Sequence, residues 1–312
     1  MPAVSVIIPV YKVEEYIERC ARNLLGQTLQ DMEFIFVDDC TPDSSMEILM
    51  QVLEDYPERR HQVKIVKNEV NKGLPFTRSV GVKIATGDYL IHCDSDDWPR
   101  PDMYEKMYAK AVSEDLDIVI CGILREYPDG STKPVRGITS TDDLLESLLY
   151  QDVLHYVHNK LVRRRIYDND LVIPAYNMLE DSPLIIQLVY YCNSWGFIEE
   201  NLYNYTYRPE SISAAWDSMA KVEQIRANVN LLLSFLDSKG LSGKYSKAIT
   251  HLKSWVKFSA LQLPRRYYLN LYPEANVPLF FDKRFTVMER LGHLSKILGT
   301  HGISRPFVKK KK

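Results

Sequence analysis

Acidic residues follow two of the apolar segments in the N-terminal third of this chain. Asp38 and Asp39 come directly after residues 33–37 (EFIFV), and the sequence DSDD at 94–97 comes directly after TGDYLIHC at 86–93. Carboxylates placed this close together repel one another unless they share a cation or bind a hydrogen-bond donor. Oxygen ligands in a short loop suit Mg²⁺ or Mn²⁺. The alternative is a solvated turn or a helix cap, but the position after an apolar strand favours a ligand site.

Glycine-rich phosphate-binding motifs are absent from the sequence. It contains neither GxGxxG nor GxxxxGK[ST], and only 13 of its 312 residues are glycine. Such motifs use backbone amide groups to cradle phosphates. A bound diphosphate would therefore need a metal ion and cationic side chains. This argues against a dinucleotide-dependent dehydrogenase and against a P-loop enzyme.

The segments that carry the acidic residues alternate between strand and helix patterns. Residues 4–10 (VSVIIPV) form a continuous β-branched run, which is typical of a buried strand. Further strands are predicted at 33–37, 63–66, 86–93 and 117–121, and helices at 13–25, 44–55, 75–85 and 101–114. This alternation predicts an α/β fold whose central sheet is mainly parallel and flanked by helices.

Three of the predicted strands end in residues suited to ligand binding. The first ends in Pro9-Val10-Tyr11, the second in Asp38-Asp39, and the fourth in the DSDD sequence at 94–97. Ligands of open α/β sheets bind at the carboxyl ends of the strands. We therefore expect these three strand ends to converge on one crevice.

The strand and helix rhythm changes after residue 122. A hairpin is predicted to turn at 128–130 (PDG), followed by helices over 141–150 and 182–192 and by short strands at 195–199 and 202–207. From about residue 216 the pattern is helical. The sequence therefore predicts a boundary near residue 215, with a C-terminal helical region over 216–312.

Charge is balanced over the whole chain but not along it. The chain has 39 Lys and Arg residues against 41 Asp and Glu residues, which gives no reason to expect a nucleic-acid partner. From Lys253 to the end, however, 13 residues are basic and 3 are acidic. Such asymmetry indicates an anionic ligand or surface near the C-terminus.

A basic amphipathic helix is predicted near the C-terminus. Residues 284–303 place apolar side chains at helical spacing among basic ones, and RPFVKKKK follows at 305–312. Such a segment can lie on an anionic membrane leaflet. The alternative is a helix packed on the rest of the protein.

The predicted location is cytoplasmic. No apolar stretch approaches the ~18 residues of a spanning helix, and no signal-peptide pattern begins the sequence. Five widely spaced cysteines without a CxxC pair favour free thiols in a reducing compartment. Because of its basic tail, the protein could also be attached peripherally to the inner face of the cell membrane.

Two long stretches of the chain resemble glycosyltransferase family 2, whose members are inverting enzymes with the GT-A fold. They are VSVIIPVYKVEEYIERCARNLLGQTLQDMEFIFVDDCTPDSS and NKGLPFTRSVGVKIATGDYLIHCDSDDW. The resemblance covers roughly residues 3–125, and more loosely 155–215. It implies a GT-A catalytic domain over 1–215, with a nucleotide-sugar-binding half at 1–125 and an acceptor-side half at 126–215.

The resemblance implies a role for four residues around the nucleotide. Tyr11 would stack on the base, and Pro9 would shape the rim of that site. Asp39 would accept a hydrogen bond from the uracil imide. Arg78 falls where the family has an arginine that supports the nucleotide site, although a surface position on a helix is the alternative.

The resemblance also identifies Asp94, Ser95 and Asp96 as the DxD motif. One carboxylate there would hold the ribose side of the donor, and another would bind Mn²⁺ or Mg²⁺. Asp97 lies beside them. Either Asp96 or Asp97 would make the metal bond.

The catalytic base of the family matches Asp181, in the pair Glu180-Asp181. Inversion is a single displacement at the anomeric carbon, so one carboxylate must take the proton of the acceptor hydroxyl. A divalent cation stabilises the leaving diphosphate, and no protein acid is needed on that side. The competing interpretation is a pair of acids at a helix N-terminus, which such residues favour.

The chain departs from the family pattern at several positions. Cys40 stands where glycine is frequent, and His158 stands where tryptophan often precedes NKL. His155 and His158 are three residues apart, but packing is the better interpretation than metal binding. Lys160 and Arg208 are candidates for contact with phosphate or acceptor.

The sequence thus predicts an inverting, metal-dependent hexosyl- or N-acetylhexosaminyltransferase. It would move sugar from a UDP-sugar to a glycan or lipid-linked acceptor in the synthesis of surface polysaccharide or glycoconjugates. One alternative is a nucleotidyltransferase on a similar sheet, which would need a glycine-rich N-terminal signature that VIIPVYKVEEYIERC lacks. Another is a non-catalytic sugar-nucleotide-binding module, which would not be expected to keep both DSDD and the ED pair.

Overall fold

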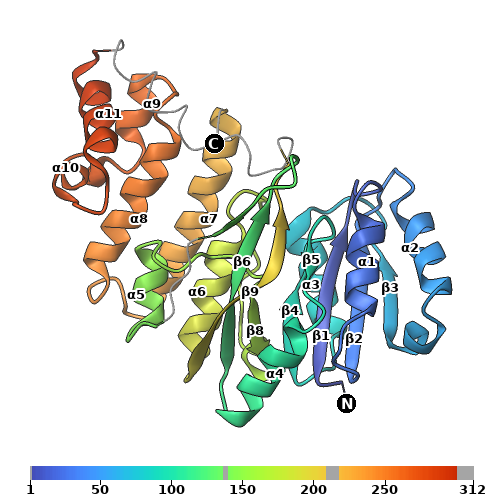
Figure 1. The fold of residues 1–312 in the computed structure, drawn as a ribbon. Helices are drawn as coiled ribbons and strands as arrows, with labels where there is room; N and C mark the ends of the chain where they lie inside the picture. Colours follow the sequence, from blue (N-terminus) through green and yellow to red (C-terminus); the bar gives the residue numbers. More distant parts are fainter. Residues whose placement is uncertain (1, 136–139, 209–217, 301–312) are drawn as a thin grey trace.

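The computed structural model describes residues 2–135, 140–208 and 218–300. Within these ranges it contains a nine-stranded sheet with helices packed around it, followed by a group of C-terminal helices (Figure 1). The α/β fold with a mainly parallel sheet and a helical C-terminal region is therefore confirmed. The predicted boundary near residue 215 and the tail from 301 onward lie outside the described residues.

The sheet divides into a parallel part and a mixed part. Its order is β3-β2-β1-β4-β8-β6-β9-β5, and β7 pairs with β6. The four strands β3, β2, β1 and β4 are mutually parallel. Strand β8 runs antiparallel to both of its neighbours, β4 and β6. The strands are β1 (Val4–Val10), β2 (Met32–Asp38), β3 (Val63–Lys67), β4 (Tyr89–His92), β5 (Trp98–Pro99), β6 (Ile118–Glu126), β7 (Thr132–Pro134), β8 (Lys160–Arg163) and β9 (Trp195–Thr206).

Helices cover both faces of the parallel part. Alternate residues of the fully buried β1 face opposite sides: Val6 joins the apolar core formed with α1 and α4, whereas Ile7 faces α3. Gly81 of α3 is needed there because a Cβ at this position would lie 2.5 Å from Ile7 Cγ2. The helices of this half are α1 (Ile17–Leu25), α2 (Ser45–Glu54), α3 (Leu74–Ile84) and α4 (Met103–Ser113), with the 3-10 helix η1 (Pro57–Gln62).

The second half of the sheet differs from the sequence prediction: β8 and the short β5 were not predicted, and the end of the sheet is arranged differently. The hairpin at 128–130 is confirmed, because β6 and β7 pair antiparallel and Gly130 has a φ of 77°. The two short strands predicted at 195–199 and 202–207 are instead one strand, β9. It pairs parallel with β6 and is interrupted by a register shift beside Gly122. Such an irregularity looks like a strand end in the sequence pattern.

The remaining helices share a second apolar core. This core joins α5 (Leu144–Leu149) and α6 (Asp181–Tyr191) to α7 (Met219–Ser238) and α8 (Ser246–Ser259). The other elements of this part are η2 (Arg164–Ile166), α9 (Arg265–Asn270), η3 (Pro273–Ala275), α10 (Pro278–Phe281) and α11 (Val287–Leu298). None of the helices in the described ranges is both long and apolar enough to cross a membrane.

Candidate active site

The carboxyl ends of β1, β2 and β4 lie side by side, as the sequence pattern predicted. Val10 pairs with Asp38 at the ends of β1 and β2, and Ile7 pairs with His92 of β4. Pro9 is buried within β1, whereas the Tyr11 ring just beyond the strand is 41% exposed. An aromatic face is therefore available to a planar ligand at this rim.

Asp39 is buried and fixes the loop that precedes α3. Its carboxylate accepts hydrogen bonds from Asn68 Nδ2 (2.8 Å) and from the backbone N–H groups of Lys72 (2.8 Å) and Gly73 (2.9 Å). Gly73 has a φ of 86°, a conformation that suits glycine. The two carboxylate oxygens together offer about four acceptor sites. These three hydrogen bonds use three of the sites, so one site remains for a donor group of a ligand.

The carboxylates of the DSDD loop have different surroundings. Asp97 is buried, and its two oxygens accept hydrogen bonds from the Tyr203 hydroxyl (2.9 Å) and the Thr206 backbone N–H (2.7 Å). Asp96 is partly exposed and pairs with Arg208 at 3.1 Å. The Arg208 guanidinium also lies over the Tyr16 ring, 4.8 Å from its centroid. The loop thus has one carboxylate bound by β9 and one paired with a cationic side chain.

The pKa values of the three aspartates in this loop are shifted in different directions, because only Asp94 has strong cationic partners. Burial, aided by the charge of Asp94, raises the pKa of Asp96 to about 6. Burial and the neighbouring carboxylates raise the pKa of Asp97 well above its usual range. Burial has the same tendency at Asp94, but Arg78 and His158 outweigh it and hold the Asp94 pKa below its usual range. A divalent cation in this loop would relieve the repulsion that raises the first two pKa values.

Arg78 connects the DSDD loop to the Glu180-Asp181 pair. Its Nη2 donates to Asp94 Oδ1 (2.7 Å), and its Nη1 donates to Glu180 Oε1 (2.7 Å) and Asp181 Oδ1 (2.6 Å). The Arg78 side chain is 4% exposed, so the alternative of a surface helix position is wrong. One guanidinium therefore holds together three carboxylates from two separate segments, the DSDD loop and the start of α6.

Glu180 and Asp181 begin α6 but do not act as ordinary helix caps. Glu180 is the N-cap residue, and its side chain makes no capping hydrogen bond. Asp181 Oδ2 accepts a hydrogen bond from the Val157 backbone N–H at 3.3 Å, and its side chain is 15% exposed. Burial and the charge of Asp181 raise the pKa of Glu180. The two carboxylates are thus similarly buried, and Asp181 is the one that the Val157 backbone N–H also orients.

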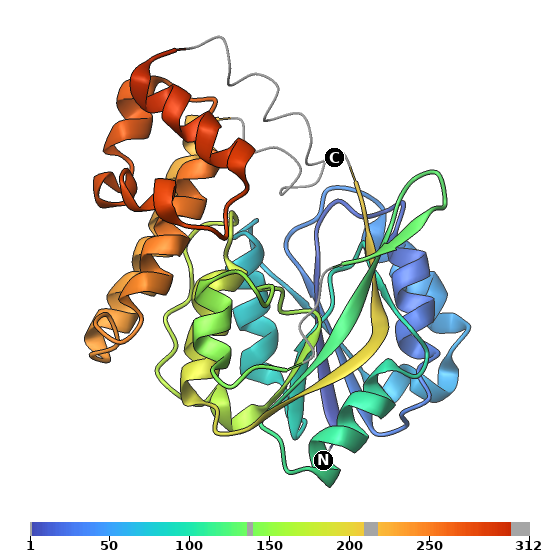
Figure 2. The same ribbon diagram turned by 60° about the vertical axis from the view of Figure 1, so that its left-hand side comes forward.

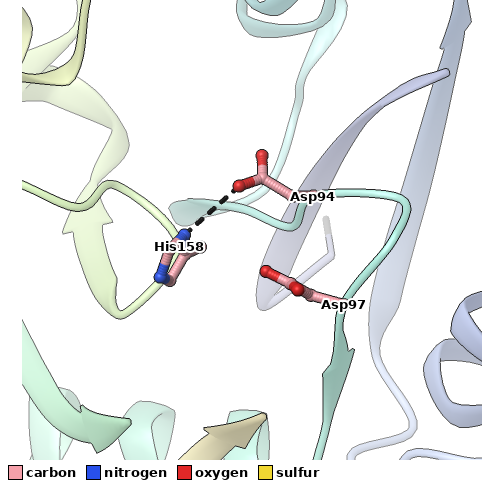
Figure 3. A group of neighbouring side chains, drawn as sticks. All are labelled: Asp94, Asp97 and His158. Carbon is pink, nitrogen blue, oxygen red and sulfur yellow. Dashed lines mark ion pairs between the residues drawn. The ribbon is translucent and has the colours of Figure 1, made fainter. Parts of the chain in front are cut away.

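His158 extends the acidic cluster. Its Nδ1 lies 3.4 Å from Asp94 Oδ2 (Figure 3), and its ring stacks on Tyr203 with centroids 4.2 Å apart. One ligand atom each from Asp94, Asp97 and His158 lie within 4.8 Å of one another. The sequence-based metal pair was Asp96 and Asp97, so this grouping shares Asp97 with it and replaces Asp96 by Asp94 and His158.

Lys160 and His155 have structural partners. Lys160 is buried and donates to the Leu154 and Tyr156 carbonyls, both at 2.7 Å, and burial lowers its pKa to about 7. It fixes its own loop, so the suggested phosphate contact is wrong for this arrangement. His155 contacts Ser182 Oγ at the start of α6 and the Leu148 carbonyl. Packing is thus the correct interpretation for His155.

Two buried histidines are expected to lower the free energy of unfolding in acid. Burial lowers the pKa of His155 to about 4 and that of His92 to about 3. As the pH falls, the histidines of the unfolded chain are protonated near pH ~6.5, before those of the folded chain. The contribution of the neutral, buried histidines to stability is therefore complete above that pH and is lost as the pH falls towards 4. We expect each histidine to cost on the order of 2 kcal/mol by pH ~5.

Chemical denaturation between pH 7 and pH 4.5 measures this loss. His155→Gln should have a shallower pH dependence than the wild type, whatever its stability at pH 7. His61→Gln is the matched control, because His61 is exposed. If both variants retain the wild-type slope, buried His155 does not drive the acid sensitivity.

The chain is similar in sequence to known proteins. Residues 5–171 match the family described as "Glycosyl transferase family 2". A Bacillus subtilis protein, "Uncharacterized glycosyltransferase EpsJ", is 31% identical over 253 residues, which are 78% of this chain and 72% of EpsJ. The chain belongs to glycosyltransferase family 2.

Solved structures share the fold of this family 2 chain. TarS of Staphylococcus aureus (residues 1–349) has a TM-score of 0.66 at 18% identity, covering 99% of this chain and 91% of that one. It has also been solved in complex with UDP-GlcNAc. The mannosyltransferase PcManGT of Pyrobaculum calidifontis, solved with GDP-Man and Mn²⁺, has a TM-score of 0.58 at 14% identity and covers 98% of this chain and 83% of that one. These likenesses confirm the GT-A fold.

The structure shows the surroundings of Cys40 and His158, two residues that depart from the family 2 pattern. Cys40 has a φ of 58°, the left-handed conformation that glycine adopts more easily. His158 continues an aromatic stack with Tyr156 and Tyr203, so a flat ring is retained where the family often has tryptophan. Sequence reasoning did not find Tyr203 or Thr206, because nothing in their spacing signals that they bind Asp97.

Proposed function

We propose that this family 2 enzyme transfers a hexosyl or N-acetylhexosaminyl group from a UDP-sugar, with inversion, to a glycan or lipid-linked acceptor. The observation that carries the proposal is the Arg78 guanidinium, which binds Asp94 on the donor side and Asp181 on the predicted acceptor side. Residues 1–125 would bind the donor and 126–215 the acceptor. The reaction would take place in the cytoplasm and contribute to surface polysaccharide or glycoconjugate synthesis.

The donor side suits a uridine nucleotide. Tyr11 presents an exposed ring to the base, with Pro9 behind it, and Asp39 retains one acceptor site for the uracil imide N–H. The TarS complex with UDP-GlcNAc supports a UDP-sugar on a similar fold. The DxD residues Asp94, Ser95 and Asp96 would face the ribose and the diphosphate.

The donor set of the DSDD loop fits Mn²⁺ or Mg²⁺. Asp96 is the stronger candidate ligand, because its side chain is partly exposed, whereas Asp97 is buried and both of its oxygens accept hydrogen bonds from β9. Asp97 and Asp94 would then shape the site around the ion. When bound, the cation would neutralise the charge that develops on the departing diphosphate.

We infer that Asp181 is the general base. This assignment is supported by the Arg78 guanidinium and the Val157 N–H, which hold the two oxygens of the carboxylate in a fixed orientation. It would take the acceptor hydroxyl proton as that oxygen bonds to the anomeric carbon and the bond to UDP breaks. The proton ends on Asp181, and UDP leaves from the opposite face, which inverts the anomeric centre.

Cation-dependent donor binding tests the proposal. We expect UDP to bind at least about tenfold more weakly in EDTA than with Mn²⁺, because the chain has no glycine-rich cradle for the diphosphate. Asp96→Asn should remove most of this cation dependence, measured by calorimetry. Asp97→Asn is the neighbouring control and should mainly lower thermal stability, since Asp97 is bound to β9.

Three outcomes would contradict parts of this proposal. Equal UDP affinity with EDTA and with Mn²⁺ would rule out the cation site. Tighter binding of GDP than of UDP would overturn the assignment of the base. Donor binding without hydrolysis or transfer, across a panel of UDP-sugars and acceptors, would favour a sugar-nucleotide-binding module instead.

A further inference from the structure

Exposed apolar side chains gather on the last two helices of the described chain and at the residue before α10. Of the 17 large apolar residues that are exposed in the described ranges, six lie between residues 277 and 298. They are Val277, Phe281, Val287, Met288, Leu291 and Leu298. We call them the C-terminal apolar face. Concentrations of this kind on a surface mark interaction sites, whereas single exposed apolar residues do not.

Helix α11 is oriented with its apolar stripe outward. Val287, Leu291, Leu294 and Leu298 follow the spacing i, i+4, i+7 and i+11, so they share one side of the helix. The first two and the last are exposed, and Leu294 is half-buried. The buried positions of α11 include His293, Ser295 and Lys296 instead. This is the reverse of the usual arrangement for a surface helix.

Hydrogen bonds on the inner side prevent the helix from turning its stripe inward. His293 contacts the Tyr268 hydroxyl through Nδ1 and the Asn276 carbonyl through Nε2 (2.7 Å). Arg265 donates to the Ile297 carbonyl near the helix end (2.6 Å). Rotating α11 about its axis would break these contacts and leave buried polar groups unpaired, which is costly. The apolar stripe therefore has to face outward.

The charges around this face favour an anionic partner. Between residues 253 and 300 the chain has eight basic and three acidic residues. Of the basic residues, Lys257 and Lys296 are buried, and Arg284 is paired with Asp152. Glu274 and Asp282 are already engaged, with Lys253 and His251 respectively. Lys283, between α10 and α11, is exposed and forms no ion pair with any described residue. Long cationic side chains beside an apolar face are typical of helices that lie in a membrane interface.

We propose that the C-terminal apolar face docks on an anionic lipid surface, with α10 and α11 lying in the interface. The apolar side chains would enter the boundary between headgroups and acyl chains, and the flanking basic residues would pair with lipid phosphates. Both views place α10 and α11 at the outer edge of the molecule, away from the parallel part of the sheet (Figures 1 and 2). This face is thus accessible to a flat surface.

Vesicle co-sedimentation of the full chain tests the proposal. The probes are vesicles of phosphatidylcholine alone and of phosphatidylcholine with phosphatidylglycerol. We expect binding to the anionic vesicles only, weakened by salt. The double substitution Phe281→Gln with Leu291→Gln should lower the partition coefficient roughly ten- to hundredfold, since two large apolar side chains no longer leave water.

The matched control is Met50→Gln with Val112→Gln. These two residues are also exposed, but they lie on α2 and α4, which are at the right and at the bottom of Figure 1, away from α10 and α11. This variant should bind vesicles like the wild type, and both variants should keep the wild-type melting temperature and UDP affinity.

Several results would overturn the proposal. If the wild type does not bind anionic vesicles, or if the Phe281 and Leu291 double variant binds them as the wild type does, the C-terminal apolar face is not the lipid contact. If a deletion of residues 301–312 abolishes binding while that double variant does not change it, the tail is the anchor. If light scattering shows a wild-type dimer that the double variant converts to a monomer, the face covers a second copy of the chain.

Discussion

Asp181→Asn is expected to lower the rate of sugar transfer by roughly 10²–10⁴-fold, the usual contribution of a positioned general base. The asparagine oxygen can still accept the hydrogen bond from Arg78 Nη1 that Asp181 Oδ1 accepts at 2.6 Å. The substitution therefore removes basicity while it keeps the size and one contact of the side chain. UDP-sugar affinity should stay near the wild-type value.

Single-turnover transfer to a competent acceptor, together with donor affinity, measures this effect. Glu180→Gln is the internal control: Glu180 shares the Arg78 guanidinium but is not the predicted base, so its substitution should reduce the rate less. Near-full transfer by Asp181→Asn would mean that another group takes the proton. If transfer and donor affinity were lost together, Asp181 would instead belong to donor binding or to folding.

Arg78→Gln is expected to have the largest effect on stability. The substitution leaves three carboxylates in a buried cluster without their cation, and loss of one partner from a buried ion pair costs about 3–5 kcal/mol. The free energy of unfolding should fall by this amount at neutral pH. Transfer should fall as well, because Asp94 and Asp181 lose the group that holds them in place.

Arg100→Gln is the matched control for denaturant unfolding. Arg100 also contacts two carboxylates, those of Asp102 and Glu200, but its side chain is 38% exposed. Exposed ion pairs contribute only ~0–1 kcal/mol, so this variant should be close to the wild type. A comparable loss in both variants would mean that the Arg78 cluster is no stronger than a surface ion pair.

Arg78→Lys separates charge from geometry. Lysine keeps the positive charge but not the planar fork that reaches Asp94 with one nitrogen and Glu180-Asp181 with the other. We expect this variant to recover part of the stability that Arg78→Gln loses, without recovering transfer. Full recovery of transfer would show that the charge alone is needed.

The sequence by itself determined the parallel half of the fold and the acids at its strand ends. Apolar runs such as 4–10 and the helix patterns between them are local signals, and each depends on residues close in the chain. The parallel connections then bring the strand ends to one edge, so Asp39 and Asp94 could be placed without coordinates. The match to family motifs added Asp181 as the predicted base.

Only the tertiary structure decided which partners these acids have. Arg78 and Asp181 are 103 positions apart, and Tyr203 is 106 positions from the Asp97 that it binds. Spacing along the chain carries no information about such contacts. The outward stripe of α11 was likewise decided by long-range contacts, because the polar partners of His293 lie on other segments and outweigh the tendency of apolar residues to turn inward. Local periodicity specifies which residues share a face, whereas the direction of that face depends on the packing of segments that are distant in sequence.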